Sequence, residues 1–136
     1  VFSYHGAEHK TIHCYEARLP LTVENVRSMT RFHPRCGTSF LFVVMMISIL
    51  LFTIIRMTNP FLRVLCKLLL LPVVVAIAYE LNRLVGRHDN WLTRILVKPG
   101  LWFQNFTTFE PDDSMIEVGI RALTLVIPEK EGSDRW

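Results

Sequence analysis

The stretch TSFLFVVMMISILLFTIIRM, Thr38 to Met57, decides the fold class of this chain. Its first eighteen residues, Thr38 to Ile55, carry no formal charge. A helix needs roughly 20 apolar residues to cross a hydrocarbon core of ~30 Å. The 136-residue chain is 51% hydrophobic with a mean hydropathy of +0.32, which is more apolar than an ordinary soluble domain of this length. We therefore predict a transmembrane helix here and an all-α membrane protein.

A second apolar segment follows a helix-breaking turn at Thr58 to Pro60. Its uncharged part, Leu68 to Tyr79, has twelve residues and is too short to span a bilayer alone. The longer segment Phe61 to Leu84 suffices if Arg63 and Lys67 extend their charged ends to the interface. We expect it to span and to complete a transmembrane helical hairpin. The alternative is a re-entrant or interfacial helix.

Basic residues flank this hairpin on both sides. They are Arg27, Arg31 and Arg35 before it, and Arg83, Arg87, Arg94 and Lys98 after it. Because cytoplasmic loops are enriched in Lys and Arg, we expect a multi-pass protein of the cell membrane with both ends of the chain in the cytoplasm. Arg56 and Arg63 in the short connection weaken the difference in basic charge between the two ends of the hairpin. The first residue is Val1 rather than Met, so we also expect a piece of a longer protein.

Composition divides the chain into three zones, which are residues 1–37, 38–84 and 85–136. The first is a polar helical segment rich in His and Cys, which we expect at the cytoplasmic face. The hairpin occupies the second. In the third, aromatic residues from Trp91 to Phe109 predict an amphipathic interfacial helix, unless they cover the hairpin. Ser114 and Glu117 have the spacing of a capping box and predict the start of a last amphipathic helix.

Charge and cysteine content restrict the partners. The net charge is +3 with a sequence pI of about 9.0, and the basic residues form no cluster of the kind that binds nucleic acid. We expect the lipid bilayer as a partner, with a membrane protein or a second copy of the chain as further candidates, and no nucleic acid. Three cysteines make no disulfide framework and indicate a reducing compartment or metal ligation.

The stretch YHGAEHKTIHCYE, Tyr4 to Glu16, concentrates candidate metal ligands. On a helix, His5, His9 and His13 fall at about 0°, 40° and 80°, with Glu16 near 20°, so they share one face. His5 and Glu16 are about 16 Å apart along the axis and cannot hold the same ion. Neighbours four residues apart can share one divalent cation such as zinc.

Within this stretch His5, Glu8 and His9 match the pattern H-x-x-E-H of the inverted zinc proteases. In that pattern the two histidines bind the metal and the glutamate activates the bound water, which assigns Glu8 as the catalytic base. The pattern is short and also arises without meaning in a His-rich helix. No third acidic ligand is identifiable from the sequence.

A second His and Cys pair, His33 and Cys36, lies directly before the first apolar segment. Histidine and cysteine from two segments can close a tetrahedral zinc site. In the alternative interpretation Pro34 and Gly37 shape the turn, Cys36 is a small buried hydrophobe and His33 is an interfacial side chain. The upstream histidines favour the metal site.

Several long stretches carry a resemblance. YHGAEHKTIHCYE, LTVENVR, RFHPRCGTSF, LLLLPVVVAIAYEL and PGLWFQNFTTFEPDDSMIEV resemble, in this order, the YqhQ-like bacterial membrane family, which is defined by a domain of unknown function numbered 1385. The resemblance covers nearly the whole chain. It implies a membrane protein regarded as a metal-dependent enzyme, whose members extend further at the N-terminus.

Two classes of function follow from these observations. The first is a metal-dependent hydrolase in which His5 and His9 bind the metal, His13, His33 or Cys36 completes the shell, and Glu8 is the general base. The second is a non-catalytic membrane scaffold or membrane-protein biogenesis factor whose His and Cys cluster is structural. The first requires an open coordination position, and the second a closed site or none. No phosphate loop, nucleophile elbow or dinucleotide fingerprint indicates a substrate.

Overall fold

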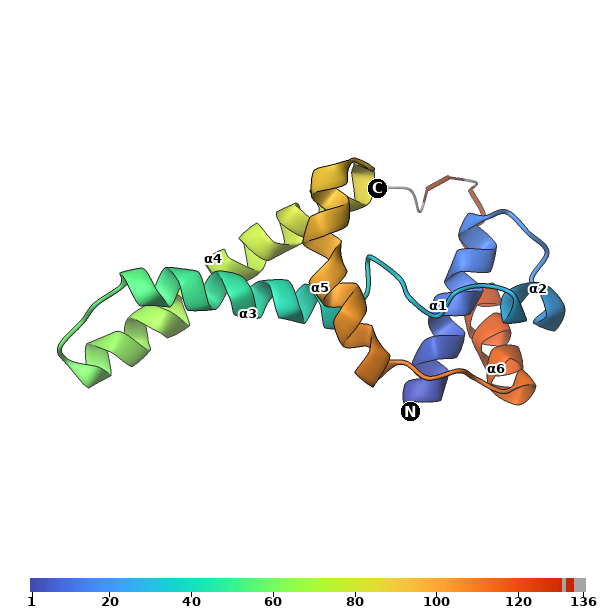
Figure 1. The fold of residues 1–136 in the computed structure, drawn as a ribbon, viewed down its shortest axis with the longest axis horizontal. Helices are drawn as coiled ribbons and strands as arrows, with labels where there is room; N and C mark the ends of the chain where they lie inside the picture. The colour runs from blue at the N-terminus through green and yellow to red at the C-terminus, as the bar shows by residue number, and fades with distance from the viewer. Residues whose placement is uncertain (131, 134–136) are drawn as a thin grey trace. The chain divides into compact units, whose positions relative to one another are not determined.

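The computed structural model describes residues 1–130 and 132–133. Its helices are α1 (Phe2–Glu16), α2 (Val23–Arg27), α3 (Gly37–Ile54), α4 (Pro60–Arg87), α5 (Trp91–Thr107) and α6 (Asp113–Thr124) (Figure 1). The described residues contain no strand. The all-α prediction is therefore confirmed.

Contacts group the residues into two compact units. The first unit combines residues 1–33 with those from 101 onward, and the second is 34–100. The boundary falls within α5, after Gly100. These units cut across the zones 1–37, 38–84 and 85–136, whose functional division stays a prediction.

The second unit is built on α3 and α4, which run side by side (Figure 1). The connection between α3 and α4 ends at the predicted turn, Thr58 to Pro60. There the Asn59 side chain accepts the N–H groups of Phe61 at 2.9 Å and Leu62 at 3.2 Å. Pro60 then opens α4, at a position where a missing N–H costs nothing. The apolar segment of α4 is thus one helix of 28 residues rather than a short core.

Both α3 and α4 are long and apolar enough to cross a membrane. Few of their apolar side chains are buried, and Leu50 and Leu69, for example, are 65% and 69% exposed. Exposed apolar surface on this scale marks a membrane or protein interaction site rather than the outside of a soluble domain. The two helices therefore indicate membrane association.

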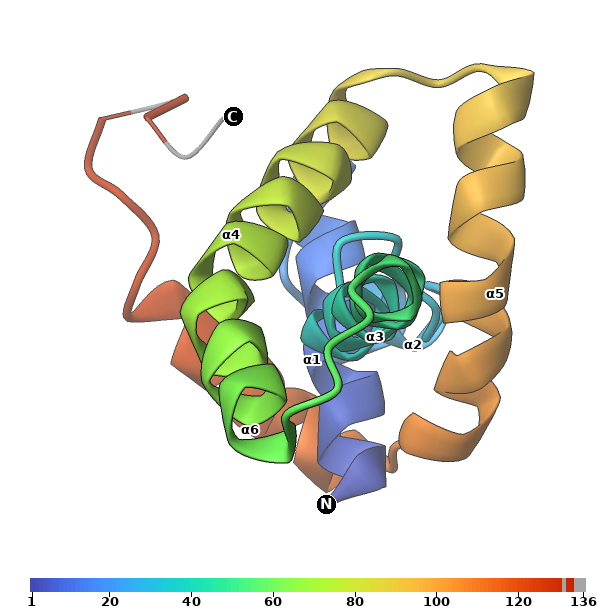
Figure 2. The ribbon, with the colours of Figure 1, turned by 90° about the vertical axis from the view of Figure 1, so that its left-hand side faces the viewer.

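The first unit packs α1 against α6 (Figure 2), and α2 contacts both. Its core consists of Cys14, Val26 and Ile116, all fully buried. Close approach of α1 and α6 depends on Gly119, because a Cβ there would lie 2.9 Å from Thr11 Oγ1. The predicted amphipathic helix thus buries its apolar stripe against the His-rich helix.

The N-terminus of α6 differs from the predicted capping box. The cap is Asp112, whose carboxylate accepts the Met115 N–H at 3.0 Å. Ser114 instead donates its hydroxyl to the same carboxylate at 2.6 Å. An ionised carboxylate is a stronger acceptor than a hydroxyl at the positive end of a helix, so Asp112 takes the position that the spacing assigns to Ser114.

The start of α1 lies against the segment after α5. The Phe109 N–H donates to the Phe2 carbonyl at 3.0 Å, and the two phenyl rings meet edge to face at 5.7 Å. A Cβ on Gly6 would lie 2.1 Å from the Phe109 carbonyl oxygen. Glycine is therefore required where α1 passes this backbone.

We expect Gly6→Ala to destabilise the first unit. Alanine gains about 1 kcal/mol of helix propensity, but the clash with a backbone oxygen costs about 1–3 kcal/mol and displaces the Phe109 segment. The apparent midpoint of thermal unfolding in detergent should fall. Gly37→Ala, at a helical glycine with nothing within 4 Å of an added Cβ, is the matched control and should not lower it. Equal midpoints for both variants would contradict the close contact.

Candidate metal centre

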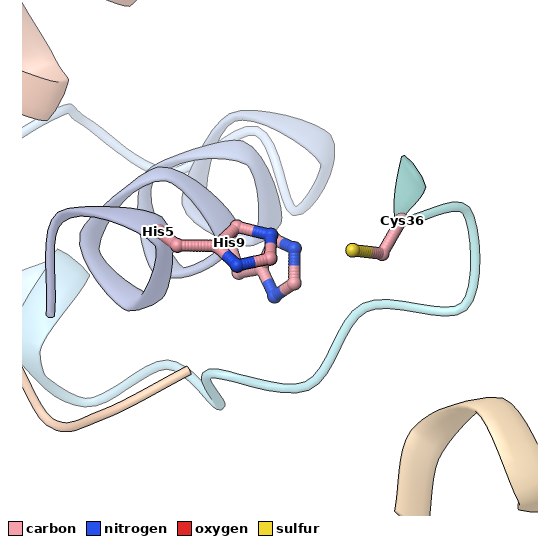
Figure 3. A group of neighbouring side chains, drawn as sticks. All are labelled: His5, His9 and Cys36. Atoms are coloured by element: carbon pink, nitrogen blue, oxygen red, sulfur yellow. The ribbon is translucent and has the colours of Figure 1, made fainter. Parts of the chain in front are cut away.

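Four imidazoles form a row in the first unit. His5, His9 and His13 come from one face of α1, and His33 comes from the segment after α2. The ring centroids are separated by 4.4 Å for His5 and His9, 5.8 Å for His9 and His33, and 4.6 Å for His13 and His33. Figure 3 shows the first two rings projecting from the same side of α1. The face predicted from helical spacing therefore exists, and His33 joins it.

Each histidine of α1 bonds to a backbone carbonyl oxygen. The contacts are His5 Nδ1 to Thr107 O at 2.8 Å, His9 Nδ1 to Arg31 O at 2.6 Å and His13 Nε2 to Phe32 O at 2.7 Å. A carbonyl oxygen can only accept, so the bonded ring nitrogen carries the proton. In the neutral ring the other nitrogen keeps its lone pair. Metal-binding histidines are oriented in this way in proteins.

Burial favours the neutral form of two of these rings. Desolvation lowers the pKa of His9, although the Arg31 carbonyl and the Glu8 charge act in the opposite direction. Desolvation also lowers the pKa of His13, and the neighbouring His33 adds to this effect. Because neutral imidazole is the form that binds metals, both rings are suited to be ligands at neutral pH.

Three donors of the first unit meet in one place. Nitrogen atoms of His13 and His33 and a carboxylate oxygen of Glu16 all lie within 4.8 Å of one another. Ligand atoms around a tetrahedral zinc ion are about 3.3 Å apart, given Zn–N distances of about 2.0–2.1 Å. His33 Nε2 and Glu16 Oε2 already lie 3.3 Å apart. Side-chain rotations that move the remaining donor atoms by about 1–2 Å would complete such a set.

Gln104 holds His33 in position. The fully buried side chain of Gln104 accepts the His33 backbone N–H at 2.9 Å and donates to the His33 carbonyl at 2.7 Å. One amide thus pairs with both backbone groups of His33, a ligand candidate outside α1. The sequence analysis missed Gln104, because a single glutamine 71 residues away along the chain carries no local signal.

A buried lysine fixes the same segments to α1. Lys10 is 5% exposed at its side chain, and its ammonium group contacts Glu110 Oε2 at 2.7 Å and donates to the Arg27 carbonyl at 3.0 Å. Arg31 reaches the same carboxylate at 3.8 Å and donates to the Thr108 carbonyl. Through Lys10 these bonds connect the end of α2 and the chain after α5 to α1, and Arg31 ties the chain after α2 to the chain after α5.

The remaining sequence candidates lie elsewhere. Glu8 is exposed on α1, and helical geometry places it about 140° from His13 around the axis. Cys36, labelled in Figure 3, is buried and caps α3, where its sulfur accepts the Thr38 N–H at 3.3 Å. Cys14 is a core residue, and burial raises the pKa of its thiol. The roles of Glu8 and Cys36 stay predictions, and Cys14 is not a ligand candidate.

The sequence of the chain is similar to that of known proteins. The family model described as "Protein of unknown function (DUF1385)" matches residues 1–129. The chain belongs to this family. It is also similar to "Uncharacterized protein YqhQ" of Bacillus subtilis (strain 168), with 42% identity over 123 residues, which cover 90% of this chain and 39% of the relative. The chain thus spans about two fifths of the length of that protein. No solved structure matches the chain.

The family confirms the resemblance to YqhQ-like proteins that the sequence stretches indicate. The family description assigns no activity. Support for the metal-dependent chemistry that the resemblance implies therefore has to come from the geometry of the candidate site. Within the first unit, His13, Glu16 and His33 lie close enough together to hold a metal ion.

We expect Gln104→Leu to destabilise the first unit. Leucine fills a similar volume but leaves the N–H and C=O of His33 without their amide partner, and each unpaired buried group costs about 1–3 kcal/mol. The midpoint of chemical unfolding should fall accordingly. Asn105→Leu, at the exposed neighbouring position, should change stability by less than about 0.5 kcal/mol. A similar loss in both variants would show that the amide pairing is not what matters.

Proposed function

We propose that the chain is the metal-binding part of a multi-pass membrane protein and acts as a metal-dependent hydrolase at the cytoplasmic face. The ion is zinc, and its ligands are His13, Glu16 and His33. One observation carries the proposal: these donors lie within 4.8 Å of one another in one compact unit. The carbonyl contact of His13 orients its ring as metal-binding histidines are oriented.

The composition of the set favours a catalytic rather than a structural ion. Two histidines and one glutamate form a three-ligand zinc site of the kind found in hydrolases, where the fourth position holds water. The Glu16 side chain is 36% exposed, which leaves one side of the set open to solvent. A zinc ion held by these residues would lower the pKa of a bound water to about 7.

The residues around the set have distinct tasks in this proposal. Gln104 holds the backbone of His33, and the carbonyl of Phe32 holds the imidazole of His13. Lys10 with Glu110 keeps the surrounding segments on α1. His5 and His9 extend the row and remain predicted ligands of an adjacent pair. Glu8, next to His9, remains the predicted general base of that pair.

A second candidate function is a membrane scaffold or biogenesis factor with a structural cluster. The contact between His33 Nε2 and Glu16 Oε2 favours it, because an imidazole N–H can donate to a carboxylate at 3.3 Å without any metal. A closed four-ligand site is the other form of this candidate. Cys36 follows His33 by three residues, so their Cα atoms are at most about 11 Å apart in any arrangement of the chain.

Replacing single ligands tests the zinc site. In detergent-purified protein, His13→Ala, Glu16→Gln and His33→Ala should each remove most of the zinc. The double variant His13→Ala/His33→Ala should lose little more, because one missing ligand already opens the site. Glu24→Gln, at an exposed glutamate of α2, is the control and should retain the metal. Elemental analysis by mass spectrometry measures the content.

Three other outcomes carry different meanings. Full zinc content in all three single variants would refute the proposed ligands. Loss only in His5→Ala and His9→Ala would place the ion at that pair. Loss in Cys36→Ser, together with the three, would indicate the closed structural site.

Glu8→Gln tests whether Glu8 is the general base, and Glu16→Gln beside it separates the two functions. The amide keeps the size of the side chain but cannot accept a proton. If Glu8 is the general base, the variant keeps its zinc and its fold while function falls by about 10²- to 10⁴-fold. The measurement is complementation of a deletion strain at matched protein level, with Glu24→Gln as control. Full complementation by Glu8→Gln would remove Glu8 from the mechanism, and full complementation by Glu16→Gln as well would favour the scaffold.

The proposed orientation places the α3–α4 connection outside the cell and both ends of the chain in the cytoplasm. A membrane-impermeant maleimide should label Thr58→Cys in intact cells, because Thr58 lies exposed in the connection. Ala17→Cys and Lys130→Cys, both exposed positions, should react only after permeabilisation. The parent protein, with its own Cys14, Cys36 and Cys66, gives the baseline. Labelling of Ala17→Cys in intact cells would reverse the assignment.

A further inference from the structure

A pocket of about 450 Å³ lies at the connection between α3 and α4, within the second unit. Its walls include three apolar side chains and three cations, which are Phe52, Ile55, Met57, Arg56, Arg63 and Lys67. Its volume is in the range of small-molecule sites. The zinc proposal does not use this pocket.

The charge around the pocket is uncompensated within its segment. From Gly37 to Tyr79 the sequence contains no Asp or Glu, and Arg56, Arg63 and Lys67 are its only Lys or Arg residues. All three line the pocket. Three cations that converge on one cavity without a carboxylate nearby in sequence favour an anionic occupant, because like charges repel unless a counter-charge joins them.

The three cations are held in different ways. Arg63 donates through Nε to the Met57 carbonyl at 3.0 Å, which fixes the connection. Lys67 places its ammonium 5.2 Å from the centroid of the Phe52 ring. Arg56 is exposed, and no hydrogen bond or ion pair engages its side chain in the part of the chain that the structure describes. Arg56 and Lys67 are therefore the groups available to an anion.

The neighbourhood of the pocket is apolar. Ile54 and Phe61, on either side of the connection, are 78% and 74% exposed. They continue the exposed apolar surface of α3 and α4, on which acyl chains can lie. A free inorganic anion would gain nothing from this surface. A phosphate with attached acyl chains would contact both the cations and the apolar helices.

We propose that this pocket binds the phosphate headgroup of an anionic phospholipid. Arg56 and Lys67 contact the phosphate oxygens, Arg63 shapes the connection, and the acyl chains lie along α3 and α4. The proposal rests on the membrane-spanning hairpin of the proposed function and is independent of the zinc site.

Native mass spectrometry of the detergent-purified protein tests the pocket. The protein is titrated with phosphatidylglycerol, with zwitterionic phosphatidylcholine and with glycerol 1-phosphate, which carries the phosphate without acyl chains. One phosphatidylglycerol should bind more tightly than either of the others. Arg56→Gln and Lys67→Gln should each weaken its binding by about fivefold, as expected for one basic residue at an anionic lipid.

Arg87→Gln provides the matched control, because Arg87 is an exposed arginine at the opposite end of α4. It should leave the affinity for phosphatidylglycerol unchanged. Circular dichroism of the three variants checks that the helices are intact. We expect Arg56→Gln to leave them intact, because Arg56 is exposed.

Three results would overturn the proposal. Equal binding of phosphatidylcholine would show a general lipid shell, and equally tight binding of glycerol 1-phosphate would show a site for a soluble phosphate. Equal effects of Arg56→Gln and Arg87→Gln would show non-specific attraction. If the lipid proposal fails, the maleimide labelling of Thr58→Cys still shows whether the membrane topology is correct, and the zinc content still shows whether the metal site is correct.

Discussion

Backbone carbonyl oxygens hold the histidine face of α1, and the first unit depends on this constraint. The carbonyls of Arg31, Phe32 and Thr107 belong to the segments after α2 and at the end of α5, and each accepts a bond from one imidazole. A ring with one nitrogen fixed in this way presents the other in a defined direction. The same contacts therefore organise the fold and prepare the donors.

The fold followed from local patterns, because each decisive signal lies within a few residues. The charge-free run from Thr38, the Asn59–Pro60 pair and the four-residue spacing of His5, His9 and His13 all predict what the structure contains. At the start of α6, the sequence spacing predicts Ser114 as the N-terminal cap, whereas Asp112 caps the helix in the structure. Residue spacing alone cannot decide between Asp112 and Ser114, because both residue types are common N-terminal caps.

The site was predicted only in part, because its decisive contacts join distant segments. Helical angles placed Glu16 on the histidine face, but only the tertiary structure shows that Glu16 meets His13 and His33. Gln104 and Glu110 come from the far end of the sequence, and neither belongs to a recognisable motif. Conversely, the H-x-x-E-H pattern directs attention to Glu8, which the structure leaves exposed and outside the His13 set.

If α3 and α4 span the membrane as proposed, the three cations beside their connection also bear on how the hairpin enters the bilayer. When a helical hairpin inserts, its connecting turn is the part that must cross the hydrocarbon. Each Arg or Lys at the centre of the bilayer costs about 2.5–3.5 kcal/mol on insertion scales. Passage of Arg56, Arg63 and Lys67 is thus an energetic barrier that a neutral turn would not present. The hairpin is therefore expected to insert slowly without assistance, and anionic lipids that neutralise the turn would lower this barrier.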